Sequence, residues 1–365
     1  MTGGHHSSAL PVIKELKRRV PDVNISWFGH RYSQRDNKAD TLEFREIKTL
    51  KIPFYDLKAG KFYKTSNPIS IIKIPLGFFQ SIYLLKKIRP QLIMSFGGYL
   101  AVPAVFAGWF LGIPAITHEQ TVTTGYANRV ISLFASKILI SFKESAKYFK
   151  RSKTIYTGIP IRETVFKRFS NKFDPKNKMP TIYISGGKTG SHKMNKIVEG
   201  SLESLLSFCN VIHQCGDHSK FKDYERLVKK TPKLKSLKGS YFPLKYVFGN
   251  EIGEVYSRAD LVISRAGAHT TAELLALNKP CILIPIPWVS HNEQYKNAEM
   301  LEKGGLSLII NEKDFSETSL VIKVRGMLGN INKYHLRQNV IDDRVKRNAQ
   351  ELIANEIISS IKKKK

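Results

Sequence analysis

Cysteine is scarce in this chain, and its spacing argues against two kinds of site. The 365 residues include 3 cysteines, Cys209, Cys215 and Cys281. An odd number without metal-like pairing argues against a disulfide scaffold and a zinc site, and it favours a reducing compartment. Cys209 and Cys281 stand in apolar, strand-like runs, where a buried structural thiol is more common than a nucleophile. We therefore expect no catalytic cysteine.

Long apolar runs are also missing. A membrane-spanning helix needs about 20 predominantly apolar residues, and the longest candidate, Ile69–Leu85, is interrupted by a lysine, a proline, a glycine and a glutamine. The run Leu100–Ile116 contains two prolines and two glycines and fits a buried helix followed by a strand. The start Met1–His5 lacks the apolar core of a secretory signal. We expect neither a signal peptide nor a transmembrane helix.

Acidic residues are few, with 30 Asp and Glu against 59 Lys and Arg, for a net charge of +29. Such an excess concerns partners and not the fold. The sequence shows no zinc-finger spacing, aromatic RNA-binding pattern or homeodomain-like helix, so we expect no nucleic acid partner. An anionic membrane surface is the other candidate, because each nearby basic residue contributes about 1 kcal/mol. A lysine-rich genome is an alternative source of part of the charge, and Lys362–Lys365 fits a frayed end.

Apolar strands alternate with helical stretches along the whole chain, which is typical of parallel α/β folds. This pattern predicts the α/β class, with two doubly wound Rossmann-like domains facing a cleft. We expect domains over 1–157 and 158–334, and a C-terminal helix with a basic tail over 335–365 that packs back on the first domain. The expected strands are Ile25–Phe28, Leu92–Phe96, Ala115–Thr117, Ile138–Ile140, Ile155–Tyr156, Thr181–Ser185, Val211–Gln214, Ser240–Phe242, Leu261–Ser264, Cys281–Ile284 and Leu306–Ile310.

The chain begins with a glycine turn, Thr2–His5, before the amphipathic stretch Ala9–Lys17. Such a turn normally follows a strand, and we interpret the missing strand as a late start or a fragment. Glycines let a backbone approach phosphate or sugar closely. His5 could act there as a general base, and an ordinary loop histidine is the alternative.

The most specific segment follows the expected strand Leu261–Ser264. The chain passes through the loop Arg265–Ala268 into a helix start at His269–Thr271. Free backbone N–H groups and the positive end of the helix dipole form an anion site at such a start. Glu273, just inside the helix, is the residue type that binds the two hydroxyls of a ribose. Phosphate beside ribose indicates a nucleotide and therefore a sugar-nucleotide enzyme.

Other turns at expected strand ends are weaker signals. Ser95–Tyr99 contains two glycines, and Ser185–Gly190 contains three. The second turn lacks P-loop spacing but suits a backbone nest for phosphate or sugar. His118 and Glu119 follow a strand and could act as acid–base machinery, although a hydrogen-bonded structural pair is an equal alternative.

The stretch Ile69–Arg89 interleaves large apolar residues with lysine and arginine. An apolar face rimmed by basic residues is how a protein lies on a membrane surface. Taken alone, the pattern favours the other interpretation, a core-facing amphipathic helix with basic ends.

Taken together, these segments resemble the MurG family of bacterial peptidoglycan glycosyltransferases, which are GT-B enzymes of glycosyltransferase family 28. The motifs follow the family's order over nearly the whole chain, from Thr2 to about Asn311. They are Thr2–His5, Phe96–Tyr99 with Pro103, Leu111–Pro114, His118–Gln120, Gly125–Arg129, Gly158–Arg162, Ser185–Gly187, Ser264–Thr270 with Glu273, and Gln294–Asn297.

The resemblance implies inverting transfer of N-acetylglucosamine from UDP-N-acetylglucosamine (UDP-GlcNAc) to lipid I, a muramoyl-pentapeptide on undecaprenyl diphosphate. The product would be lipid II, for peptidoglycan synthesis. It also implies an N-terminal domain that binds the acceptor and touches the cytoplasmic face of the cell membrane as a peripheral protein. The C-terminal domain would bind the UDP-sugar without metal or cofactor. Another lipid or polyprenyl-linked acceptor, or a non-catalytic homologue, remains the alternative.

The resemblance also implies site residues. His5 would be the base on the acceptor C4 hydroxyl, and Glu119 is the second catalytic candidate. Ala268–Thr270 would lie under the diphosphate, Glu273 would bind ribose, and Gln294 would contact the transferred sugar. The substrate-binding residues expected in full are Thr2, Gly3, Gly4, Thr121, Asn128, Arg162, Lys188, Phe248, Gly249, Ala268, His269, Thr270, Thr271, Glu273, Gln294 and Asn297.

Two departures from the family pattern concern this set. Thr121 stands where the family has asparagine, so it supplies one hydroxyl in place of an amide. Lys188 and Thr189 replace the family's Ser-Gln pair, and Lys188 could meet a diphosphate as a point charge. Sugar selectivity is therefore less firmly implied than nucleotide binding.

Overall fold

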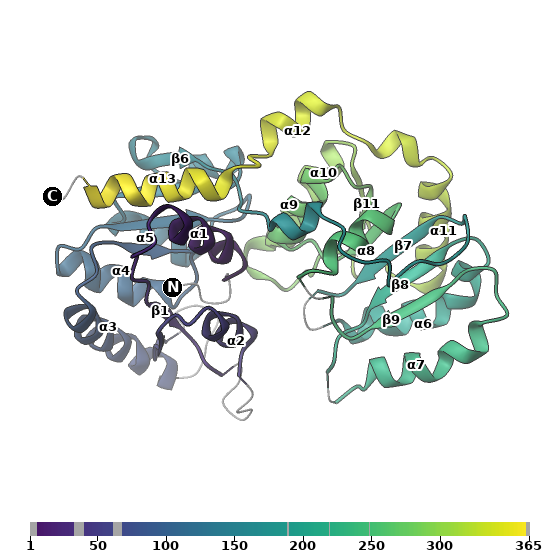
Figure 1. The fold of residues 1–365 in the computed structure, drawn as a ribbon, viewed down its shortest axis with the longest axis horizontal. Coiled ribbons are helices and arrows are strands. Elements are labelled where there is room, and N and C mark those ends of the chain that lie inside the picture. The colour runs from purple at the N-terminus through teal and green to yellow at the C-terminus, as the bar shows by residue number, and fades with distance from the viewer. Residues whose placement is uncertain are drawn as a thin grey trace. The chain divides into compact units, whose positions relative to one another are not determined.

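The computed structural model describes residues 6–32, 40–60, 68–187, 190–218, 220–247 and 249–362 (Figure 1). The chain divides into two compact units, one of residues 1–161 with 346–365 and one of residues 162–345. The expected residues Thr2, Gly3, Gly4 and His5 lie outside the described ranges, as do Lys188 and Phe248.

The second unit is built on one parallel sheet of six strands in the order β12-β11-β10-β7-β8-β9. The chain enters at β7, builds outward through β8 and β9, and then returns through β10 to the other side. The order therefore reverses between β7 and β10. The strands are β7 (Thr181–Ser185), β8 (Asn210–Gln214), β9 (Tyr241–Leu244), β10 (Leu261–Ser264), β11 (Cys281–Leu283) and β12 (Ser307–Ile309).

Helices connect these strands and bury the apolar sheet. The helices are α6 (His192–Leu206), α7 (Asp223–Leu234), α8 (Ile252–Arg258), α9 (Ala268–Ala276), α10 (Glu293–Lys303), α11 (Glu317–Leu328) and α12 (Gln338–Arg344), with 3-10 segments η3 (Glu163–Phe166), η4 (Ser290–Asn292) and η5 (Ile331–Tyr334). Side chains of α6, α7 and α11 pack in one core with alternate strand residues such as Ile182 and Ile184. Alternation along each strand thus separates the two faces of the sheet.

The first unit carries two parallel sheets, a four-stranded one in the order β3-β4-β5-β6 and the pair β1-β2. The strands are β1 (Trp27–Gly29), β2 (Phe54–Asp56), β3 (Ile93–Ser95), β4 (Ala115–Glu119), β5 (Lys137–Ile140) and β6 (Thr154–Tyr156). The helices are α1 (His6–Arg19), α2 (Leu42–Thr49), α3 (Pro68–Ile88), α4 (Ala101–Phe110) and α5 (Tyr126–Phe134), with 3-10 segments η1 (Lys143–Tyr148) and η2 (Arg151–Lys153). None of the described helices is long and apolar enough to cross a membrane.

The C-terminal helix α13 (Ala349–Lys362) belongs to the first unit, where it lies beside α1 (Figure 1). Its Ile353 and Ile357 share a core with Ala9 and Val12 of α1 and with Trp27 of β1. An ion pair joins Lys137 Nζ of β5 to Glu356 Oε2 at 2.6 Å. Residues more than 300 positions apart in the sequence thus build one core.

The predicted α/β class and the predicted strands are confirmed, with small differences. Strand β2 was not predicted, because it has 3 residues with partly exposed side chains and little apolar signal. The buried cysteines are also confirmed, since all three thiols are buried and free. Burial raises the pKa of Cys209 and of Cys215 to about 12, so neither is ionised at neutral pH.

Candidate functional site

The best candidate site lies at the carboxyl ends of β10, β7 and β8. Residues Ser264, Ser185 and Gln214 are aligned there, because Ser264 pairs with Ser185 and Ser185 pairs with Gln214. The strand order reverses between β7 and β10, and open parallel sheets bind ligands at such a switch point. The loops after these strands therefore form the candidate site.

The start of α9 presents its backbone toward solvent. The N-cap is Gly267, which has no side chain to cap the helix, and an added Cβ there would meet no atom within 4 Å. Residues Gly267 to Thr270 are half-buried. The first-turn N–H groups and the helix dipole can therefore meet an anion. Thr271 differs from the expectation, because its buried hydroxyl donates to the carbonyls of Gly267 and Ala268, at 3.1 and 3.0 Å.

Glu273 lies one turn inside α9, and two partners hold its buried carboxylate. Arg162 Nη2 donates to Oε1 at 3.3 Å, and the Tyr256 hydroxyl donates to Oε2 at 3.0 Å. Burial and the neighbouring Glu273 raise the pKa of Tyr256 well above its usual value, so Tyr256 stays a donor. A carboxylate has about four acceptor positions, and two donors leave capacity for ligand hydroxyls.

The glycine loop after β7 is shaped by close backbone contacts. Gly187 and Gly190 have φ of 93° and 77°, which disfavours other residues. A Cβ on Gly190 would lie 2.0 Å from the Cys215 carbonyl oxygen. Gln214 Nε2 also donates to Gly187 O at 3.0 Å. Gly187 and Gly190 therefore both lie against the end of β8.

Arg265 ties three loops of this site together. The side chain is buried, and its guanidinium donates to Ile284 O at 3.1 Å, to Ser191 Oγ at 3.0 Å and to the Glu312 carboxylate. Ser191 caps α6, the helix after the glycine loop. Neither Arg265 nor Tyr256 was predicted from the sequence to belong to the site. A lone arginine among the small residues of the loop was the available signal for Arg265.

Gln294 and Asn297 face the same loops from α10. Gln294 Oε1 accepts the Ile286 N–H at 3.1 Å, and Asn297 Nδ2 donates to Ala266 O at 3.1 Å. Asn297 is fully buried, so it positions the loop before α9. The preceding His291 and Asn292 adopt φ of 56° and 53°. Such left-handed residues often occur at functional loops.

The remaining second-unit candidate, Gly249, is exposed and makes no close approach, since a Cβ there would meet no atom within 4 Å. Within the described ranges, no group of three or more His, Cys, Asp or Glu side chains is placed to hold a metal ion.

In the first unit, Glu119 ends β4 as the centre of a buried hydrogen-bond network. Oε1 accepts the N–H groups of Gln120 and Thr121 at 2.9 and 3.1 Å, and Oε2 accepts Asn128 Nδ2 at 2.9 Å. The Thr121 hydroxyl lies 3.0 Å from Oε1 and also contacts the Thr123 carbonyl. Burial raises the pKa of Glu119 against these hydrogen bonds. This geometry fits the structural alternative better than acid–base chemistry.

The second glycine turn packs against this network. Gly97 and Gly98 have φ of 82° and 83°, and a Cβ on Gly97 would lie 2.9 Å from Asn128 Nδ2. Gln120 Nε2 donates to Phe96 O at 3.0 Å. The ends of β3 and β4 thus form one ordered surface. His118 points elsewhere and contacts Gly158 O at 3.0 Å.

An apolar face covers part of the first unit. It consists of Leu76, Phe79 and Tyr83 of α3, Phe106, Trp109 and Phe110 of α4, and Tyr126, Val130 and Leu133 of α5, all of them exposed. These helices are neighbours, and Trp109 contacts the Phe134 ring at 5.2 Å between centroids. Exposed fractions of 66% for Phe79 and 71% for Leu133 show that the face is uncovered in this chain. Helix α3 also packs on the core, as the core-facing interpretation predicts, since Leu84 and Leu85 on it are buried.

Comparison with known proteins gives consistent matches. The model of the glycosyltransferase family 28 N-terminal domain matches residues 2–140, and that of the family 28 C-terminal domain matches residues 181–356. A Borrelia hermsii protein named UDP-N-acetylglucosamine–N-acetylmuramyl-(pentapeptide) pyrophosphoryl-undecaprenol N-acetylglucosamine transferase is 31% identical over 361 residues, 97% of this chain and 93% of the relative. A Clostridium botulinum protein of that name is 32% identical over 96% of both chains. The crystal structure of Acinetobacter baumannii MurG is similar with a TM-score of 0.69, at 23% identity over 98% of both chains.

Proposed function

The chain belongs to glycosyltransferase family 28, and from this we propose that it transfers N-acetylglucosamine from UDP-GlcNAc to an undecaprenyl-diphosphate-linked muramoyl-pentapeptide, with inversion. The names of its full-length relatives supply donor and acceptor. One observation in the molecule supports the donor half most directly. The open N-terminus of α9 and the carboxylate of Glu273 lie one turn apart at the switch point of the second sheet.

The donor would be held by groups of the second unit. N–H groups of Ala268 to Thr270 would receive the diphosphate and stabilise the charge that develops on UDP as it leaves. Glu273, held by Arg162 and Tyr256, would accept both ribose hydroxyls. Such preorganised donors need no rearrangement at the moment of reaction.

The other donor assignments are proposals of the same kind. Gln294 would face the transferred sugar, and the buried Asn297 beside it would act by holding the loop before α9. Phe248 or Gly249 would meet the uracil, and Lys188 would meet the diphosphate. Thr271 would act through the helix start, because its hydroxyl is bonded to Gly267 O and Ala268 O.

The first unit would bind the acceptor. We propose that His5 removes the proton from the attacking hydroxyl, with Thr2, Gly3 and Gly4 around the acceptor diphosphate. Glu119 would be a positioning residue, because four donors from Gln120, Thr121 and Asn128 already surround it. A buried, saturated carboxylate is poorly suited to exchange protons with a substrate.

We also propose that the protein binds the cytoplasmic face of the cell membrane peripherally. The apolar face of α3, α4 and α5 would enter the interface, and the net charge of +29 would attract anionic lipids. The first unit would then lie where a lipid-linked acceptor is found.

The proposed activity can be tested with labelled UDP-GlcNAc and a lipid I analogue. We expect UDP release and a product heavier than the acceptor by one N-acetylhexosamine. Turnover only with a different polyprenyl-linked sugar would transfer the proposal to that acceptor, and no turnover with any lipid-linked acceptor would contradict it.

A matched pair of variants tests the ribose assignment. Glu273→Gln keeps the size of the side chain and removes its charge, so UDP affinity measured by calorimetry should fall at least about tenfold, as expected for charge-assisted hydrogen bonds. Glu299→Gln, at a half-buried position of α10 where the carboxylate pairs with Lys303 Nζ at 3.0 Å, should bind UDP as the unchanged chain does. Equal affinity in all three proteins would remove Glu273 from the ribose site.

A further inference from the structure

The first unit has a hollow beside strands β5 and β6. Parallel strands β5 and β6 are joined by residues 141–153, all described, which form η1 and η2 and no α-helix. β6 is the edge strand of its sheet. Short 3-10 turns cover less of a sheet than the usual crossover helix. They leave a cavity of about 490 Å³, within the range of small-molecule sites.

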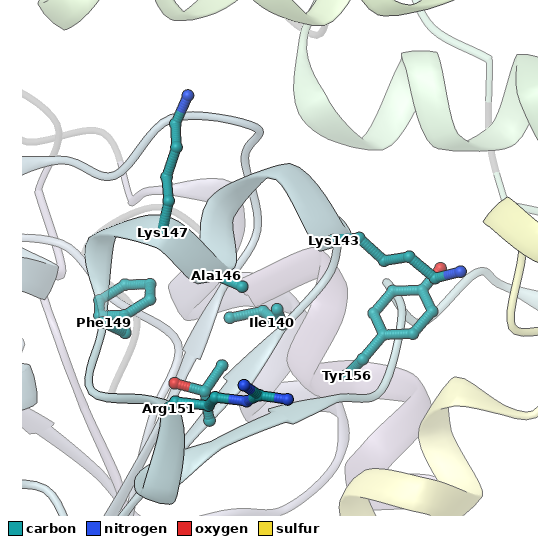
Figure 2. A pocket seen from close by; sticks show the side chains of 8 residues that line it. Ile140, Lys143, Ala146, Lys147, Phe149, Arg151 and Tyr156 are labelled. Carbon is teal, nitrogen blue, oxygen red and sulfur yellow. The ribbon is translucent and has the colours of Figure 1, made fainter.

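The lining of this cavity combines apolar and basic side chains. It consists of Ile140, Lys143, Ala146, Lys147, Phe149, Arg151, Thr154 and Tyr156 (Figure 2). The ionisable side chains among these eight are three cations and one tyrosine. In Figure 2 the Arg151 side chain extends toward Tyr156 and that of Lys143 ends beside it, whereas Lys147 extends away.

Two lysine ammonium groups lie close to the ring of Tyr156. Lys143 Nζ lies 5.7 Å and Lys346 Nζ 5.4 Å from its ring centroid. Lys346 reaches this place because Gly158, with φ of 77°, lets its segment approach, and a Cβ on Gly158 would lie 2.7 Å from Lys346 Cβ. Together with Arg151, these cations bring positive charge to the Tyr156 side of the cavity. They would attract an anion bound there.

We propose that this cavity binds a small phosphate ester with an apolar part. Arg151 would bind the phosphate in two-point contact, Lys143 and Lys346 would add charge, and Ile140 and Phe149 would cover the apolar part. This site is separate from the proposed donor site, because all its residues belong to the first unit.

The phosphate could come from a soluble ester or from a phospholipid head group. Arg129 of α5 lies over the Tyr148 ring of η1 at 5.2 Å, and α5 carries Val130 and Leu133 of the apolar face. The cavity therefore neighbours the surface that we propose for the membrane.

Methyl NMR of the full chain tests the site locally. Ile140 and Ala146 line the cavity and report binding, while Ile282 in the core of the second unit reports folding. The probes are inorganic phosphate and, separately, nanodiscs of phosphatidylcholine with or without phosphatidylglycerol. The test variant combines Lys143→Ala with Arg151→Ala. The control is Lys150→Ala, which removes an exposed charge of the same connection outside the lining.

We expect saturable shifts of Ile140 and Ala146 in the unchanged chain and in the control, and an apparent affinity at least about tenfold weaker in the double variant. Shifts with phosphate indicate that a soluble ester suffices. Shifts only with phosphatidylglycerol nanodiscs assign the phosphate to a lipid. Absence of saturable shifts with both probes, or equal shifts in the double variant with Ile282 unchanged, overturns the proposal. The readout does not use glycosyl transfer, so it is independent of the proposed function.

Discussion

At the scale of single residues, the proposed donor site depends on side chains that position the nucleotide-binding loops and do not contact the nucleotide themselves. Arg265 and Tyr256 touch loops and side chains that we assign to the nucleotide. Asn195 supports the glycine loop indirectly, since its Nδ2 donates at 2.8 Å to Cys215 O, which lies beside Gly190. Such supporting contacts set the precision of a site.

Gly190 gives the sharpest prediction at this scale. Gly190→Ala places a Cβ against the Cys215 carbonyl at a positive φ, so the free energy of unfolding should fall by about 1–3 kcal/mol. UDP affinity should fall as well, because the loop must move. Gly326→Ala is the control, since Gly326 is exposed in α11 with open space around it and should gain up to about 1 kcal/mol. Urea unfolding measures both, and equal stability of the two variants would contradict the argument.

Asp223 predicts a pH dependence of stability. Burial by itself raises the pKa of Asp223, but hydrogen bonds from Asn195, His192 and Arg226 together lower it below its usual value. The ionised carboxylate therefore stabilises the fold above the unfolded-state pKa of about 3.9, and this contribution is lost as pH falls through the lower folded value.

Asp223→Asn should accordingly be less stable than the unchanged chain at pH 7, and the difference should shrink toward pH 3. Urea unfolding at several pH values measures it. Asp22→Asn, at an exposed position, should show no such trend. A difference that stays constant from pH 7 to pH 3 would assign the effect to packing and not to charge.

At the scale of elements, helix α13 is a distant part of the chain that completes a core. Ile353 and Ala354 are fully buried in a cluster with Trp27 and Leu139 of the first unit. The helix returns along the surface of α1, so a C-terminal segment stabilises an N-terminal fold. Strand alternation along 1–157 does not reveal this contribution.

Ile353→Ala should lower the stability of the first unit by about 2–4 kcal/mol, because it leaves a cavity in a packed core. Trp27 lies in the same cluster, so its intrinsic fluorescence should report that the variant unfolds at a lower urea concentration than the unchanged chain. Ile322→Ala, at an exposed position on α11, should change stability by less than about 0.5 kcal/mol. Unfolding of the Ile353 variant at an unchanged urea concentration would show that α13 contributes little.

At the scale of the whole molecule, charge and apolar surface act together. The net charge of +29 attracts anionic surfaces over distances set by the ionic strength. The apolar face of α3, α4 and α5 acts only on contact. Stable binding to a membrane would need both the electrostatic attraction and the insertion of the apolar face, because either contribution alone gives weak, reversible binding.

Sedimentation with phosphatidylglycerol-containing vesicles checks this combination. Binding should weaken as salt rises from 0.05 to 0.5 M, because the Debye screening length shortens from about 10 Å at 0.1 M toward about 3 Å at 1 M. Phe79→Ser with Phe110→Ser should weaken it at least about tenfold further, at about 1.5–3 kcal/mol per inserted side chain. Trp288→Ser removes an exposed aromatic residue of the second unit and serves as the control. Equal loss in the control would mean that the apolar face is not the contact surface.

Much of this molecule follows from local pattern. Apolar runs between helical stretches predicted the parallel strands. The turn before Thr270 with Glu273 behind it predicted the nucleotide site that we propose. These features need only neighbours in sequence, because strand periodicity and helix capping are local properties. Folding in three dimensions settled matters of a different kind. It placed the Tyr256 hydroxyl beside Glu273 and joined Arg265 to Glu312. It also brought Asn195 to the Cys215 carbonyl. Each of these depends on which distant atoms meet, and local spacing carries no information about that.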